Sequence, residues 1–139
     1  MNSASASIEH INPPELARPS GFSHAVRVSG GSTVYLAGQT ALDPDGRIVG
    51  DTVVRQFEQA LANLLAALRA AGGSPADLVS MTVYIVDMDD YRANAREIGK
   101  VWKRLVGDAY PAMAGVGVAR LWDADALVEV QGFATLTDG

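Results

Sequence analysis

The sequence predicts a single α+β domain in which two amphipathic helices pack on a mixed, mostly antiparallel sheet. Residues 52–71 and 91–106 carry apolar side chains at three- and four-residue spacing, the period of a helix with one buried face. Residues 33–38, 78–86 and 126–136 are rich in strand-forming residues or alternate as strands do. Two helices separated by a strand predict a sheet with one helix-covered face. A chain of 139 residues has room for one hydrophobic core.

The N-terminal region is predicted to be extended. Three prolines in residues 1–20 bias the residues before them away from helix, so we expect an arm there, followed by a single domain over 21–139. Residues 22–28 and 33–38 flank a Gly30-Gly31 turn signal, and this pattern predicts a hairpin.

Acidic residues mark the start of both predicted helices. Asp51 is predicted to cap the first helix. Asp87, Asp89 and Asp90 lie at a strand-to-helix junction, where helix capping is favoured over metal ligation because carboxylates stabilise a helix N-terminus. The chain has no cysteine and two histidines, and it carries none of the usual phosphate-loop or dinucleotide motifs. We therefore expect no metal and no cofactor.

The charge balance is acidic, with 11 Lys and Arg against 16 Asp and Glu and a net charge of −5. Such a field repels a phosphate backbone and an anionic lipid surface, so nucleic acid and membrane are not the expected partners. The sequence has no apolar leader and no 18-residue apolar run, which leads us to expect a cytoplasmic protein.

Glu129 is the most telling residue for function. Residues 126–136 place Leu127, Glu129, Gln131 and Phe133 on one face of a strand, opposite apolar neighbours. A carboxylate at that position is either exposed on an open sheet face or buried with a partner, and a buried one has a raised pKa suited to proton transfer. An uncovered face of this kind also predicts that subunits assemble on it.

His24 follows Ser23 directly, which raises the alternative of a nucleophile with its base. A histidine bonded to backbone is the favoured interpretation, because no acidic residue that could orient the ring lies near in sequence.

Four segments resemble one known family. The sequence is similar to the YjgF/RidA group, the reactive intermediate deaminases, whose motifs are G-P-Y-S-x-A-V, a strand ending in S/A-G-Q, T-V-F-x-x-D-M and A-L-V-E-I-E-A. The corresponding segments here are Gly21-Phe22-Ser23-His24-Ala25-Val26, Val34-Tyr35-Leu36-Ala37-Gly38-Gln39, Thr82-Val83-Tyr84-Ile85-Val86-Asp87-Met88 and Ala126-Leu127-Val128-Glu129-Val130.

The resemblance implies a chorismate-mutase-like fold assembled as a homotrimer, with an inner barrel of sheets and ligand pockets between neighbouring subunits. In deaminating members an arginine in a P-x-R-S segment holds the substrate carboxylate. A glycine and a tyrosine line the pocket, and a glutamate positions the water that hydrolyses an enamine or imine.

For this chain the resemblance implies that Glu129 is the catalytic glutamate and that Gly38 is the pocket glycine. The tyrosine position is Phe22, which keeps the ring without the hydroxyl. In the segment Pro111-Ala112-Met113-Ala114 the arginine position is Met113, followed by Ala114 as a further lining residue. A thioether cannot replace a guanidinium, so this chain is a divergent member that should act poorly on the usual 2-aminoacrylate-type substrate.

Two classes of function stay open at this point. The first is a trimeric hydrolase of an enamine, imine or related nitrogen-containing metabolite, with a larger and less anionic substrate because Met113 makes the pocket more apolar. The second is a non-catalytic metabolite-binding or protein-protective module. Ribonuclease activity is disfavoured by the acidic charge balance.

Overall fold

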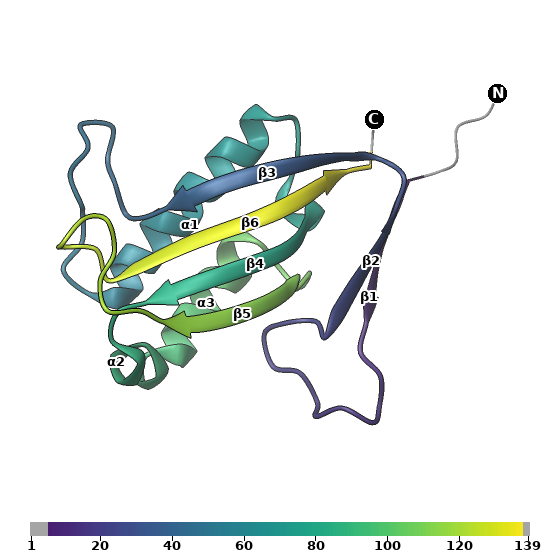
Figure 1. The fold of residues 1–139 in the computed structure, drawn as a ribbon, viewed down its shortest axis with the longest axis horizontal. Coiled ribbons are helices and arrows are strands. Elements are labelled where there is room, and N and C mark those ends of the chain that lie inside the picture. The colour runs from purple at the N-terminus through teal and green to yellow at the C-terminus, as the bar shows by residue number, and fades with distance from the viewer. Residues whose placement is uncertain (1–5, 138–139) are drawn as a thin grey trace.

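The computed structural model describes residues 6–137, and residues 1–5 of the predicted arm and 138–139 of the predicted domain lie outside this range. Helices cover one face of a four-stranded sheet, and a separate two-stranded hairpin projects to one side of it (Figure 1). The strands are β1 (Ser7–Ile11), β2 (Ala25–Ser29), β3 (Ser32–Gln39), β4 (Leu78–Ile85), β5 (Ala112–Gly117) and β6 (Val128–Leu136). The helices are α1 (Val53–Ala70), the short 3-10 turn η1 (Pro75–Asp77), α2 (Met88–Ala93) and α3 (Ala95–Leu105).

The larger sheet has the strand order β3-β6-β4-β5. Strand β6 pairs antiparallel with both β3 and β4, whereas β4 and β5 are parallel. A parallel pair needs a crossover connection, and α2 and α3 supply it. The predicted fold class, helices on a mixed and mostly antiparallel sheet, is therefore confirmed.

The predicted hairpin between residues 22–28 and 33–38 is wrong. Strand β2 pairs with β1, which lies within the predicted arm, and β3 pairs with β6 at the C-terminal end of the chain. Gly30 and Gly31 both have positive φ, 69° and 77°, so the chain does turn at this point. Turn residues specify that the chain changes direction, and they do not specify which strand takes up the hydrogen bonds on either side.

Helix α1 agrees closely with the prediction for residues 52–71, although its cap differs. Thr52, not Asp51, is the N-cap, and its hydroxyl accepts a hydrogen bond from the Arg55 amide at 3.2 Å. Gln56 is buried in α1 and fixes the loop before β6. Its side chain donates to the carbonyls of Gly50 and Asp125 and accepts from the Leu127 amide at 2.7 Å.

The predicted second helix over residues 91–106 is in fact two helices that meet at Asn94. The Asn94 side chain donates to the Asp90 carbonyl at 2.9 Å, and its backbone leaves the helical region with φ −106° and ψ 15°. A side chain that bonds the preceding turn competes with the helical ladder in this way. Asp87 caps α2 by accepting from the Asp90 amide at 3.1 Å, which confirms capping as the role of this acidic segment.

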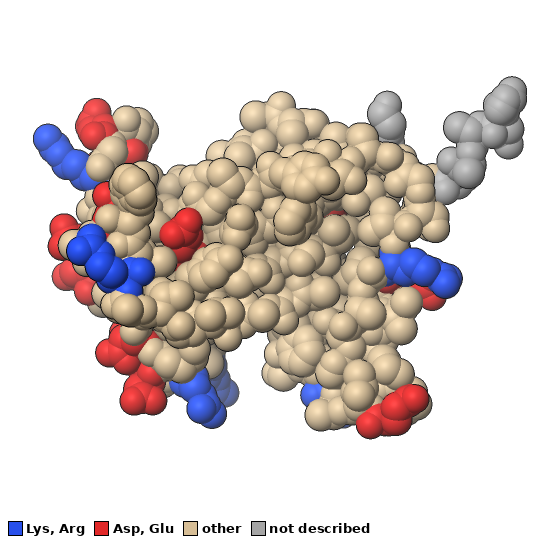
Figure 2. Space-filling model, in the orientation of Figure 1, with Lys and Arg blue, Asp and Glu red and all other residues tan. Residues whose placement is uncertain are grey.

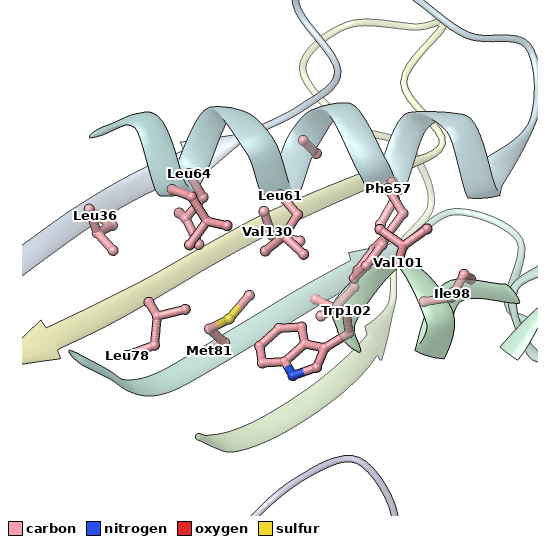
Figure 3. Close-up of a cluster of buried hydrophobic side chains, with 14 of the residues drawn as sticks. Leu36, Phe57, Leu61, Leu64, Leu78, Met81, Ile98, Val101, Trp102 and Val130 are labelled. Carbon is pink, nitrogen blue, oxygen red and sulfur yellow. The ribbon is translucent and has the colours of Figure 1, made fainter. Parts of the chain in front are cut away.

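The core lies between the helices and the sheet, as Figure 3 shows for its central part. In β6 the side chains of Val128, Val130 and Ala134 are fully buried against the helices, whereas Gln131 and Phe133 are exposed on the other face. The predicted alternation of this strand is confirmed. The other large buried side chains come mainly from α1, β4 and α3: Phe57, Leu61, Leu64, Leu68, Leu78, Met81, Ile85, Val101 and Trp102.

Candidate functional site

The sheet face turned away from the helices is nearly uncharged. Among all residues of β3, β4, β5 and β6, Glu129 is the one with a charged side chain. Figure 2 views the molecule from this side, and charged side chains gather toward its periphery. A single carboxylate on such a surface is a distinctive chemical feature.

Gly38 makes room for that carboxylate. A Cβ atom built on Gly38 would lie 2.0 Å from Glu129 Oε2 and 2.9 Å from its Cδ. The β3–β6 register shifts between Leu36 and Gln39, so an irregularity in β3 brings its backbone under the Glu129 side chain. Gly38 is therefore needed for space, and the two residues that the sequence assigned to one site do lie together.

Polar side chains on the neighbouring strands continue this site. Tyr84 in β4 is the direct register partner of Glu129, and its hydroxyl donates to Gln131 Oε1 at 2.8 Å. Within residues 6–137 Glu129 is half-buried and makes no hydrogen bond or salt bridge with another side chain or amide. Its carboxylate oxygens are thus available to bind water or a substrate proton.

Apolar side chains lie on the same face beyond this polar group. Tyr35 is 76% exposed, Phe133 39% and Val116 40%. The rings of Tyr35 and Phe133 meet edge to face with centroids 5.3 Å apart. Exposed apolar side chains gathered on one sheet face indicate a surface that another molecule covers.

Met113 belongs to a second site, a cleft of about 180 Å³ between α3 and β5 that we call the α3–β5 cleft. None of its lining side chains is charged at physiological pH, and burial raises the pKa of Tyr91 to about 12. The residues that line it are Ser20, Gly21, Phe57, Tyr91, Ala95, Ile98, Gly99, Trp102 and Met113.

Within one chain, Met113 and Glu129 lie on opposite faces of the sheet. Met113 pairs with Met81, whose side chain is buried on the helix side, whereas Glu129 pairs with Tyr84 on the open side. Ala114, the register partner of Thr82, is exposed on the open side. A single subunit therefore separates the predicted glutamate from the residue at the predicted arginine position.

Phe22 lies on the β5 side of the molecule. The Ser23 amide donates to the Pro111 carbonyl at 3.0 Å, and Ser23 bridges Ala112 at the start of β5. The Phe22 ring contacts His24 edge to face, with centroids 5.1 Å apart. Phe22 and Met113 are thus brought to one region, and Gly38 and Glu129 to another.

Ser23 and the histidines have structural roles. His24 Nε2 is 2.6 Å from the Ala17 carbonyl, which confirms the backbone-bonded interpretation. The buried Ser23 hydroxyl donates to the Tyr110 carbonyl at 2.6 Å, and His10 Nδ1 lies 2.9 Å from the same oxygen. His10 Nδ1 also lies 3.1 Å from Ser23 Oγ, so the ring, the hydroxyl and the carbonyl form one hydrogen-bonded cluster. These hydrogen bonds connect β1 to the segment that precedes β5.

The sequence did not predict Tyr84 as the register partner of Glu129, nor an unpaired indole nitrogen at Trp102 among the described residues. Tyr84 could have been found from the alternation of residues 78–86, which places it opposite the buried side chains of its strand. Trp102 gave no such signal, because a tryptophan on the apolar stripe of a helix is normally a core residue.

Known proteins share this sequence pattern over most of the chain. The family model described as Endoribonuclease L-PSP matches residues 14–136. A RutC family protein from Pyrococcus horikoshii is 35% identical over 124 residues, covering 88% of this chain and 91% of the relative. A 2-iminobutanoate/2-iminopropanoate deaminase from Mus musculus is 37% identical, covering 72% of this chain and 70% of the relative.

Solved structures of known proteins also share the fold of this chain. A protein of unknown function of the Rid family, YyfB from Yersinia pestis, superposes with a TM-score of 0.84 at 36% identity and covers 93% of this chain and 98% of that one. E. coli TdcF with bound serine gives a TM-score of 0.65 at 31% identity, covering 86% of this chain and 91% of that one. The fold and the match define an α+β domain of the YjgF/RidA type, and the chain belongs to the YjgF/RidA family. None of the described helices is long and apolar enough to cross a membrane.

Proposed function

We propose that this protein is a homotrimeric hydrolase of C=N bonds, with each site formed between two subunits. One subunit contributes Glu129 and Gly38 from its open sheet face, and the neighbour contributes Phe22 and Met113 from its β5 side. The separation of these pairs within one chain supports the proposal, because in a closed ring each subunit contacts its neighbours through two different patches, and a site between subunits then takes one half from each. The exposed apolar side chains of the open face support it as well.

Glu129 is proposed as the general acid and base. Water adds to the imine carbon while the carboxylate takes its proton, and the proton then passes to nitrogen. The C–N bond of the resulting carbinolamine breaks to give a carbonyl product and ammonia. The observation that carries this role is the isolation of Glu129, the one charged side chain of the four strands, held over Gly38 with no competing partner among the described residues.

The substrate is proposed to be less anionic than those in the names of the deaminase relatives. Met113 and the other residues of the α3–β5 cleft are uncharged, so a substrate carboxylate would find no cation there. Activity toward 2-iminopropanoate is therefore expected to be weak.

Substitution of Glu129 by Gln tests the proposal. The change keeps the shape of the side chain and removes its proton-transfer capacity, so imine hydrolysis should fall about 10²- to 10⁴-fold. Hydrolysis is measured as ammonia release from imines generated in situ, for both a carboxylate-bearing and a carboxamide-bearing substrate. Unchanged turnover in Glu129→Gln would contradict the catalytic role.

A non-catalytic binding module is the second candidate, and the apolar residue at position 113 favours it. In that case the wild-type protein releases no ammonia above the uncatalysed rate, and Glu129→Gln leaves ligand binding unchanged. RNA cleavage, the activity in the description of the family model, finds no support in an open face that carries one acidic and no basic side chain on its four described strands.

A further inference from the structure

Trp102 has a polar atom that the fold does not satisfy. The residue is 5% exposed, and across residues 6–137 its Nε1 is the one buried side-chain nitrogen or oxygen with no hydrogen-bond partner. Leaving a buried donor unpaired is unfavourable by about 1–3 kcal/mol. This N–H has almost no accessible surface, so an acceptor from a ligand reaches it only when a neighbouring side chain moves aside.

Trp102 borders the α3–β5 cleft, and its N–H lies just beneath the surface. Trp102 comes from α3 and Met113 from β5, and both line this cleft. Figure 3 shows the indole nitrogen on the ring edge that faces away from α1, on the side of β5. Tyr110 stacks on the ring with a centroid distance of 6.0 Å and an interplanar angle of 13°, which holds the indole in this orientation.

The surroundings select the charge of the ligand. Phe57, Ile98 and Met113 are apolar, and the Tyr91 phenol is uncharged at physiological pH, like any tyrosine, with burial raising its pKa further, to about 12. A carboxylate placed among these side chains would lose its hydration without gaining a cation. A neutral carbonyl oxygen loses less hydration and accepts one hydrogen bond, which the indole can donate. Met113 is a flexible wall that can change rotamer to admit such a group.

We propose that the α3–β5 cleft binds a neutral carbonyl group of the substrate and that Trp102 Nε1 donates the hydrogen bond that recognises it. This inference rests on the proposed hydrolysis of C=N bonds and names its substrate class. The substrate is an imine or enamine whose second functional group is an amide or ester, in place of a carboxylate. Trp102 thus takes over, for a neutral group, the anchoring role of the missing arginine.

The two tryptophans of the chain allow a direct measurement by NMR. In the ¹⁵N-labelled protein each gives one indole N–H signal, and Trp122, which is 93% exposed, is the internal reference. The probes are 2-oxobutanamide and 2-oxobutanoate, which share a carbon skeleton and differ in charge. The amide should shift the Trp102 signal downfield in a saturable way and leave the Trp122 signal in place. It should also bind at least about fivefold more tightly than the carboxylate, because it gains one hydrogen bond.

Three variants separate recognition from folding. Trp102→Phe removes the donor and keeps an aromatic ring, and it should weaken the amide about fivefold while leaving the carboxylate affinity unchanged. Met113→Arg should reverse the preference in favour of 2-oxobutanoate, whereas Met113→Leu, similar in volume, should preserve it. A Trp102 signal that does not move at saturating amide, or equal or tighter binding of the carboxylate by the wild-type protein, overturns the inference.

The same titration in Glu129→Gln distinguishes this inference from the proposed reaction. If the wild-type protein releases no ammonia above the uncatalysed rate but the amide still shifts Trp102 in both proteins, the recognition stands and the reaction falls. If hydrolysis of carboxamide-bearing imines is present but Trp102 does not respond, the reaction stands and the recognition falls.

Discussion

The open sheet face and the α3–β5 cleft are built in opposite ways. On the open face a charged group is held by a close steric fit, because the Glu129 carboxylate occupies the space where a side chain on Gly38 would lie. In the cleft all lining groups are neutral, and the exceptional feature is the indole N–H of Trp102, a donor without an acceptor that lies just beneath the cleft surface. In the proposed function these regions have two tasks: the open face carries the group for proton transfer, and the cleft selects what is bound. A change of substrate in this chain then needs changes in the cleft alone.

The largest expected effect, short of replacing Glu129 itself, comes from Gly38→Ala. The new Cβ would lie 2.0 Å from Glu129 Oε2, so the carboxylate must rotate away, and hydrolysis should fall about 10²-fold or more toward the Glu129→Gln level. The clashing atoms are the end of a flexible side chain, so the thermal midpoint Tm should change little. Ammonia release and a melting curve measure the two quantities.

Gly115→Ala is the matched control for that substitution. Gly115 also lies in a strand, and a Cβ there would meet Ile85 Cδ1 at an ordinary 3.5 Å. Activity in Gly115→Ala should stay within about twofold of wild type, as for a surface substitution that creates no clash. Equal losses in the two variants would show that the Gly38 effect is not steric.

The smallest expected effect concerns the neutrality of the cleft at high pH. Burial in the folded protein raises the pKa of Tyr91 from its ordinary value of 10.0 to about 12, so the unfolded chain loses this proton first as pH rises. The stability contributed by the neutral phenol is complete below pH 10 and is lost between about pH 10 and 12, amounting to about 2 kcal/mol.

Tyr91→Phe measures this contribution. Denaturant unfolding of the variant and of wild type from pH 8 to 11.5 should show a steeper loss of stability with pH in wild type, because the variant has no phenolic proton to lose at this position. Parallel pH profiles would indicate that Tyr91 ionises normally and that the cleft is open to water.

Much of this architecture could be predicted because it depends on local patterns. The alternation around Glu129 indicated both the last strand and the face on which the carboxylate lies, and the apolar period of residues 52–71 indicated α1. The pairing of β2 with β1 could not be predicted, since the turn at Gly30 and Gly31 is compatible with several partners.

The missing parts of the site depend on contacts between distant segments. The unpaired nitrogen of Trp102 is visible only when every neighbour of α3 and β5 is in place. The steric need for Gly38 likewise requires the register of β3 against β6, where the irregularity between Leu36 and Gln39 sets the close approach. Sequence resemblance indicated both Gly38 and Glu129 as site residues, and the structure supplies the physical reason that they occur together.

The central claim, that the two halves of each site come from different subunits, is tested most directly by mixing two inactive variants. Glu129→Gln removes the carboxylate, and Met113→Trp fills the α3–β5 cleft of about 180 Å³. If the halves meet between neighbours in a trimer, refolding an equal mixture should restore about a quarter of the wild-type sites and of the ammonia release. A mixture as inactive as its two components, or a light-scattering mass equal to one chain, would contradict the account.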